Sequence, residues 1–178
     1  MFPNKIIVNS IVYMIDKITE ITEMPDKSHW HWENLQKISP NCIPSSSDYD
    51  FYKSYSKGRI LLLGCTWALL PLCTQAWDLD PIYDDPKIIQ KDWFSIDEHW
   101  DTIILDGGLT FGKKFTENIL SAMLNHCDRF IVRTFLNPDW QPRYACYYPR
   151  AHELTPQPEE HPVNDVYTFY IWNQNKQS

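Results

Sequence analysis

The sequence predicts an α/β protein whose doubly wound, mostly parallel sheet follows an N-terminal helical cap. Several short apolar runs between residues 60 and 135 show no polar alternation, which is typical of strands buried on both faces. Helical stretches separate these runs, as in parallel sheets built from crossover connections. All five glycines fall between Gly58 and Gly112, in the same region of the chain. The turns that need glycine are therefore expected between these strands and helices.

Three helical pieces are predicted before the first strand. Apolar residues recur at spacings of three and four over residues 7–23, the pattern of an amphipathic helix, and Pro25 follows its end. Ser28 can cap a second, shorter helix over residues 29–35, with His31 where a complete capping box has a carboxylate. A loop rich in serine and proline follows. An aromatic helix then begins at Asp48 and ends with Gly58 as its C-cap.

Five buried strands are predicted next. They span residues 60–63, 76–79, 88–90, 101–106 and 130–135. A short helix over residues 67–73 follows the first strand, and an amphipathic helix over residues 115–124 follows the fourth.

The C-terminal part of the chain is shorter and richer in proline and aromatic residues. Its single predicted strand, residues 166–172, is expected as an antiparallel addition at the sheet edge. The chain is therefore expected to form one domain, with a helical cap (1–57), an α/β core (58–136) and a shortened C-terminal extension (137–178).

Composition excludes several classes of protein. A net charge of −7 and a pI near 5.3 argue against general nucleic-acid affinity. No apolar run approaches the roughly 20 residues of a membrane span, so a soluble, cytoplasmic protein is expected. The five cysteines form no C-x-x-C pair and are expected as free, buried thiols. His29 and His31 lack further ligands at a readable spacing, so no metal site is expected.

The carboxyl ends of the first two strands carry the first candidate site residues. Ligands of open parallel sheets bind at these ends, where the strand order reverses. Gly64 follows the first strand and allows a sharp turn, and Thr66 is placed to cap the next helix. Asp80 follows the second strand, sixteen positions after Gly64, near the interval at which an acidic side chain binds ribose hydroxyls. Asp78, on the same face, is the alternative.

The third and fourth strand ends carry similar groups. Asp92 and Trp93 supply a carboxylate and a large aromatic plane suited to a purine, although a surface aspartate and a core tryptophan explain them singly. Asp106, Gly107 and Gly108 place an acid and two glycines where the backbone can approach a ligand. Four such coincidences at four strand ends indicate a nucleotide-type ligand more strongly than any one of them.

These motifs together resemble the class I S-adenosylmethionine-dependent methyltransferases, which have a Rossmann-like sheet. The segments that carry the resemblance, in order, are Ile60-Leu61-Leu62-Leu63-Gly64-Cys65-Thr66, Asp80, Asp92-Trp93, Trp100-Asp101 and Asp106-Gly107-Gly108-Leu109-Thr110. The likeness is greatest to the branch with L-G-x-T as its first motif and D-G-x-L after the fourth strand. It covers roughly residues 28–136.

The resemblance implies S-adenosylmethionine as cofactor and a role for each motif. The methionine part of the cofactor would be lined by Gly64, Cys65 and Thr66. Asp80 would hold the ribose hydroxyls, and Asp92 and Trp93 would meet the adenine. The sulfonium and the substrate would be bordered by Asp106, Gly107 and Gly108.

The resemblance further implies methyl transfer to an acceptor, which we expect to be a small molecule. Such a transfer is an in-line displacement that depends mainly on positioning, with a general base where the acceptor must lose a proton. Candidates for that base are Asp106, His29 and His31. The aromatic residues of the cap either line an acceptor pocket or, as we favour, pack its core. They are Trp30, Trp32, Tyr49, Phe51, Tyr52 and Tyr55.

Two other functions compete with this hypothesis. A catalytically silent protein of the same fold that binds cofactor or a partner protein is favoured by the single glycine of the first motif and by the short C-terminal part. A nicotinamide-dependent oxidoreductase is disfavoured because no G-x-G-x-x-G follows the first strand. The sequence does not indicate an oligomeric state.

Overall fold

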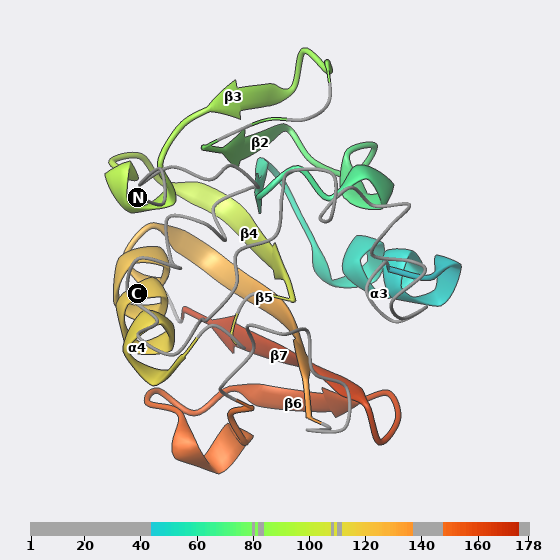
Figure 1. Ribbon diagram of the computed structural model, residues 1–178, viewed down its shortest axis with the longest axis vertical. Helices are drawn as coiled ribbons and strands as arrows, with labels where there is room; N and C mark the ends of the chain where they lie inside the picture. The colour runs from blue at the N-terminus through green and yellow to red at the C-terminus, as the bar shows by residue number, and fades with distance from the viewer. Residues whose placement is uncertain are drawn as a thin grey trace, which may run out of the picture.

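A computed structural model describes residues 44–79, 81, 84–107, 109, 112–136 and 148–174 of the protein. In this part of the chain, seven strands form one sheet in the order β3-β2-β1-β4-β5-β7-β6, as Figure 1 shows. The expected α/β fold with a mostly parallel sheet is confirmed. Several predictions lie outside the described residues: the helices at 7–23 and 29–35, Trp30, Trp32, His29, His31, Asp80 and Gly108.

The strands are β1 (Ile60–Leu63), β2 (Gln75–Asp78), β3 (Ile88–Gln90), β4 (Trp100–Asp106), β5 (Cys127–Phe135), β6 (Glu159–Pro162) and β7 (Tyr167–Asn173). The first five run parallel, whereas β7 is antiparallel to both β5 and β6. The helices are α3 (Ser46–Tyr55) and α4 (Lys113–Leu124), with 3-10 turns η3 (Trp67–Leu69), η4 (Trp93–Ser95) and η6 (Ala151–Glu153). Neither of these two α-helices, the ones in the described part of the chain, has the length and apolar content of a membrane span.

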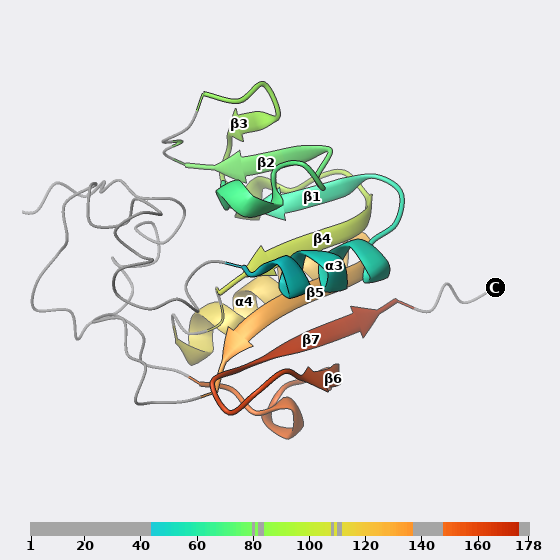
Figure 2. The ribbon, with the colours of Figure 1, turned by 90° about the vertical axis from the view of Figure 1, so that its right-hand side faces the viewer.

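The two faces of the sheet are covered by different helices, and Figure 2 shows α3 and α4 on opposite sides. Alternate residues of a strand point to opposite faces, so Leu61 packs in the cluster under α4 and Leu62 in the cluster under α3. Every residue of β1 is buried, as the unbroken apolar run predicts. Burial of both faces thus explains why the central strands lack polar alternation.

Helix α3 begins two residues earlier than predicted. Ser45 is its N-cap, and the reciprocal bonds between Ser45 and Asp48 complete a capping box. Asp48 therefore occupies the third helical position and does not open the helix. The helix ends at Tyr55, so Gly58 is not its C-cap; Gly58 has a φ of +60° in the turn that leads into β1.

The connection after β1 is also shorter than predicted. The expected helix over residues 67–73 is reduced to the 3-10 turn η3, followed by turns around Pro71. Proline removes a backbone donor and disfavours a continued helix, which accounts for the early end. The polypeptide therefore returns to the sheet quickly, and β2 begins at Gln75.

The antiparallel strand near the C-terminus is confirmed as β7, but its expected position at the sheet edge is wrong. β7 lies between β5 and β6, and the outermost strand is β6. A hairpin therefore completes a seven-stranded sheet, although η6 is the only helical segment described between β5 and β6. Among its described residues, the C-terminal region contains both strands of the hairpin and only the short helical segment η6.

Candidate functional site

The carboxyl ends of β1 and β4 lie side by side at the centre of the sheet, where Leu63 is in register with Leu105. From β1 the chain builds outward through β2 and β3, and from β4 it builds the other way through β5. This reversal of strand order is the place where open α/β sheets bind ligands. Figure 2 shows the arrowheads of β2, β4 and β5 pointing to one side, the side on which α3 begins.

The turn after β1 is held by hydrogen bonds to β2. Gly64 has a φ of +92°, and its N–H donates to the carbonyl of Trp77 over 2.8 Å. The next N–H, that of Cys65, donates to a carboxylate oxygen of Asp78 over 3.1 Å. Because Asp78 is fully buried at the last position of β2, its carboxylate is fixed beside this turn. The structure thus brings together Gly64 and Asp78, the sequence's alternative to Asp80.

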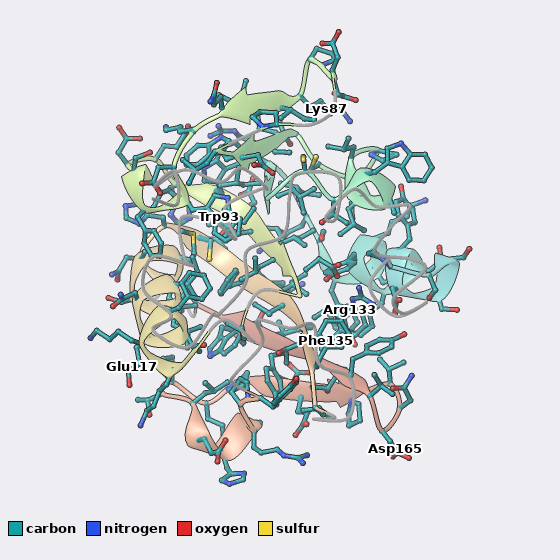
Figure 3. The ribbon with its side chains drawn as sticks, viewed as in Figure 1. Lys87, Trp93, Glu117, Arg133, Phe135 and Asp165 are labelled. Carbon is teal, nitrogen blue, oxygen red and sulfur yellow. The ribbon has the colours of Figure 1, made fainter. Side chains whose placement is uncertain are left out.

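Trp93 packs against the same turn and bonds to the carbonyl that accepts the Gly64 N–H. Its side chain, labelled in Figure 3, is 4% exposed, and its indole N–H donates to the Trp77 carbonyl over 2.7 Å. A Cβ atom added to Gly64 would lie 3.7 Å from the indole ring, so the turn and the ring are in close contact. Asp92 caps η4 by accepting the N–H of Phe94 over 2.9 Å. The expected contact of Asp92 and Trp93 with adenine stays a prediction.

The turn after β4 is the second turn of the site. Gly107 has a φ of +82°, and its N–H donates to the carbonyl of Arg133 on β5 over 2.8 Å. The carboxylate of Asp106, the last residue of β4, pairs with the Arg133 guanidinium through two bonds. Nε lies 2.7 Å from Oδ1, and Nη2 lies 3.0 Å from Oδ2. Tyr52 of α3 donates a third bond to Oδ1, over 2.8 Å.

A second carboxylate shares the same guanidinium. Oδ2 of Asp48 lies 3.5 Å from Nη1 of Arg133, and the Asp48 carboxylate also accepts the Tyr167 hydroxyl over 3.0 Å. We call Asp48, Asp106 and Arg133 the charge cluster. Its three side chains are 1–3% exposed. Figure 3 shows Arg133 beside α3, the helix that supplies Asp48.

Protonation in and around the charge cluster follows from its burial. Burial, and then the carboxylate of Asp106, raise the pKa of Tyr52 well above its ordinary value. Tyr52 is therefore a neutral hydrogen-bond donor. Burial lowers the pKa of Arg133, but Asp106, with further contributions from Tyr52 and Asp48, outweighs that effect and raises it overall. Arg133 therefore keeps its positive charge.

Arg133 is not among the site residues predicted from the sequence, although a signal for it is present there. An arginine inside the largely apolar strand 130–135 must either reach solvent or find buried acidic partners, because an isolated buried charge is very costly. Its acidic partners among the described residues are Asp48 and Asp106, and no local spacing links those positions to 133. The sequence therefore predicts that Arg133 needs acidic partners, but it does not identify which residues they are.

The geometry also bears on the candidate general bases. Both oxygens of Asp106 accept hydrogen bonds, and its side chain is 3% exposed, so Asp106 is placed to hold the β4 turn. His29 and His31 lie outside the described residues. Within the described ranges, no group of three or more His, Cys, Asp or Glu side chains is arranged to hold a metal ion.

The described aromatic residues of the cap pack against the C-terminal hairpin. Phe51 stacks on Phe169 of β7 with ring centroids 3.9 Å apart, and it also stacks on Tyr55. Tyr52 meets Phe169 edge-on at 5.1 Å. For these residues, core packing is the role that the structure supports, and α3 is fixed to the sheet along its length.

Comparison with known proteins identifies the fold. Neither a family model nor a curated protein matches the sequence. A solved DhpI–SAH complex aligns with 94% of this chain and 96% of its own, at 12% identity and a TM-score of 0.59. TehB from Haemophilus influenzae aligns with 80% of this chain, at 15% identity and a TM-score of 0.53, and the match spans 66% of TehB. The protein has the class I S-adenosylmethionine-dependent methyltransferase fold.

In this methyltransferase fold, the described site consists of two glycine turns and the charge cluster beside them. The helix expected after β1 is reduced to the 3-10 turn η3. The β1 turn is held by the Asp78 carboxylate, which accepts the Cys65 N–H, and by the Trp77 carbonyl, which accepts both the Gly64 N–H and the Trp93 indole N–H. The β4 turn is held by Arg133. The methyltransferase scaffold thus fixes both turns with buried side chains.

Proposed function

We propose that the protein transfers a methyl group from S-adenosylmethionine to a small-molecule acceptor. One observation carries the proposal: the turns after β1 and β4, each with a glycine at positive φ, meet at the centre of a sheet of the methyltransferase fold. Ligands of such sheets bind at this crevice. The solved DhpI structure, which shares the fold, is a complex with SAH.

The residues present fit this cofactor. Any other residue at Gly64 or Gly107 would have to adopt a φ near +90°, which L-residues avoid, so both turns beside the crevice require glycine. Gly64, Cys65 and Thr66 would line the methionine part, with Asp106, Gly107 and Gly108 across the crevice. Asp80 or Asp78 would accept bonds from the ribose hydroxyls. Asp92 and Trp93 would lie on the adenine side.

The chemistry asked of the polypeptide is modest. S-adenosylmethionine, when bound, supplies an activated methyl group, and the protein must align the acceptor and exclude water. Asp106 serves best as a positioning residue, because Tyr52 and Arg133 occupy both of its oxygens. If the acceptor must lose a proton, His29 or His31 would then be the general base.

The second candidate function is a silent protein of the same fold that binds cofactor without turnover. It is favoured by the engagement of Asp106, which leaves that carboxylate poorly placed to take a proton. An acceptor whose nucleophilic atom carries no proton would need no general base, so turnover would not depend on Asp106 taking a proton. The two functions therefore differ in turnover and share the binding site.

Calorimetry with S-adenosylmethionine and S-adenosylhomocysteine tests both proposals at once. We expect binding of both ligands with dissociation constants below about 1 mM. Failure to bind either ligand would refute both the methyltransferase and the silent cofactor binder. Consumption of the methyl donor in the presence of a panel of small nucleophiles would then favour the enzyme, and binding without consumption across the panel would favour the silent binder.

A further inference from the structure

We propose that Asp48, acting through Arg133, makes the site prefer a positively charged ligand over its neutral counterpart. The inference rests on the proposed function, in which the cofactor carries a sulfonium and the product a neutral thioether. It assigns to Asp48, a residue of the cap helix, a role in ligand selectivity. Asp48 is a positioning residue in this scheme, since it acts by way of Arg133 and Asp106.

The charge cluster carries more negative than positive charge. Its two carboxylates, Asp48 and Asp106, share the single guanidinium of Arg133. Tyr52 and Tyr167, which donate to these carboxylates, have raised pKa values because of burial and contribute no charge near neutral pH. One negative charge is therefore left in excess among these five described side chains.

Burial makes this excess effective at a distance. Charges at exposed positions are screened by water and salt within about 10 Å, whereas buried charges are screened far less. The cluster side chains are at most 3% exposed, and the cluster includes Asp106, which ends β4 at the crevice between β1 and β4. A ligand in that crevice would sit beside a negative potential. A sulfonium would gain from that potential, and a thioether would not.

Asp48 is the member of the charge cluster whose charge can be removed with the least disturbance of the β4 turn. Asp106 holds the β4 turn and Arg133 holds both acids, whereas Asp48 lies on α3, one step further from the crevice. Asp48→Asn removes the excess charge and keeps one carbonyl oxygen, which can accept the Ser45 N–H, while the amide nitrogen replaces the oxygen that accepts the Tyr167 hydroxyl. Tyr167→Phe is the matched control, because it breaks a hydrogen bond to the same carboxylate and changes no charge.

The experiment measures the dissociation constants of three ligands by calorimetry. They are S-adenosylmethionine, its stable amine analogue sinefungin, and S-adenosylhomocysteine, which lacks the positive charge at that position. Selectivity is the dissociation constant of S-adenosylhomocysteine divided by that of a cationic ligand. In Asp48→Asn we expect selectivity to fall by about three- to tenfold. In Tyr167→Phe we expect it to stay within about twofold of wild type.

Equal selectivity in Asp48→Asn and wild type would overturn the inference, as would an equal fall in both variants. If Asp48→Asn does not fold, Asp106→Asn with Tyr52→Phe forms a second pair of the same design, since Tyr52 donates to Asp106. Wild-type protein that bound S-adenosylhomocysteine more tightly than both cationic ligands would also overturn it. Binding of none of the three ligands would instead count against the proposed function.

Discussion

The phenol of Tyr52 donates a 2.8 Å hydrogen bond to the carboxylate of Asp106, 54 positions later in the sequence. It joins the middle of α3 to the carboxyl end of β4. The same helix carries Asp48, which pairs with the guanidinium of Arg133, the residue that also pairs with Asp106. The described part of the predicted cap is therefore a structural component of the candidate site as well as a cover for one face of the sheet.

Tyr52→Phe should lower the free energy of unfolding by about 1–2 kcal/mol, because a buried hydrogen bond to a charged acceptor is lost while the ring still packs. Urea denaturation followed by circular dichroism measures the change. Tyr49→Phe on the same helix is the control, since the Tyr49 hydroxyl has no hydrogen-bond partner among the described residues. Equal losses in the two variants would show that the bond from Tyr52 to Asp106 contributes nothing specific.

Gly64→Ala should reduce both stability and cofactor affinity. A φ of +92° strains any L-residue by about 1–3 kcal/mol, and relief of that strain would move the turn after β1. Gly58→Ala is the comparison at the opposite end of β1, where φ is +60° and a Cβ would collide with the Asp101 carboxylate. We expect Gly58→Ala to lose stability alone. Calorimetry with S-adenosylhomocysteine separates the variants, and an unchanged affinity in Gly64→Ala would remove this turn from the site.

Asp80→Ala should weaken cofactor binding by about 1–3 kcal/mol through the loss of hydrogen bonds to the ribose hydroxyls. Asp78→Asn is the companion variant, because Asp78 accepts the Cys65 N–H and lies at the last position of β2. Both are measured as dissociation constants for S-adenosylhomocysteine. Normal binding by Asp80→Ala with weak binding by Asp78→Asn would move the ribose assignment to Asp78.

Stability should fall as the pH rises above about 9. Burial, and then Asp128, raise the pKa of Cys127 from 9.0 to about 12, and burial raises the pKa of Cys73 to about 11. Between the unfolded and folded pKa values, the unfolded chain releases a proton that the folded chain retains. Each such thiol therefore removes about 1.4 kcal/mol per pH unit from the free energy of unfolding.

Cys127→Ala should make this pH dependence shallower. Urea unfolding of the variant and of wild type, measured at intervals from about pH 8 to about pH 11, gives the two slopes. Below about pH 9 the difference between the proteins should be constant, because there it reflects only the lost packing of the thiol. Identical slopes above that pH would contradict the prediction.

The sequence predicted the strands that carry the motifs well. The bounds of β1 and β3 agree with the structure, and those of β2 and β4 differ by one residue at an end or both. These strands are short apolar runs flanked by polar or turn-forming residues, so local composition determines them. β5 begins three residues earlier than predicted, at Cys127, because pairing with Trp100 of β4 extends it into a polar stretch.

The features that the sequence could not supply depend on contacts between distant residues. β6 reads Glu-Glu-His-Pro, which has low strand propensity, and it is a strand because β7 pairs with it. The charge cluster joins positions 48, 106 and 133, which only the folded sheet brings together. Of the candidate site residues, the structure groups Gly64, Cys65 and Trp93 around one turn and Asp106 and Gly107 at the next.

β6 has a further consequence for the behaviour of the protein in concentrated solution. As the outermost strand described on its side of the sheet, it offers backbone groups to which another molecule could add a strand. Glu159 and Glu160 are exposed there and would repel a second copy of the same edge, and Pro162 has no N–H to donate. At the opposite edge, β3 spans three residues. Both borders of the sheet therefore resist growth into strand-linked aggregates.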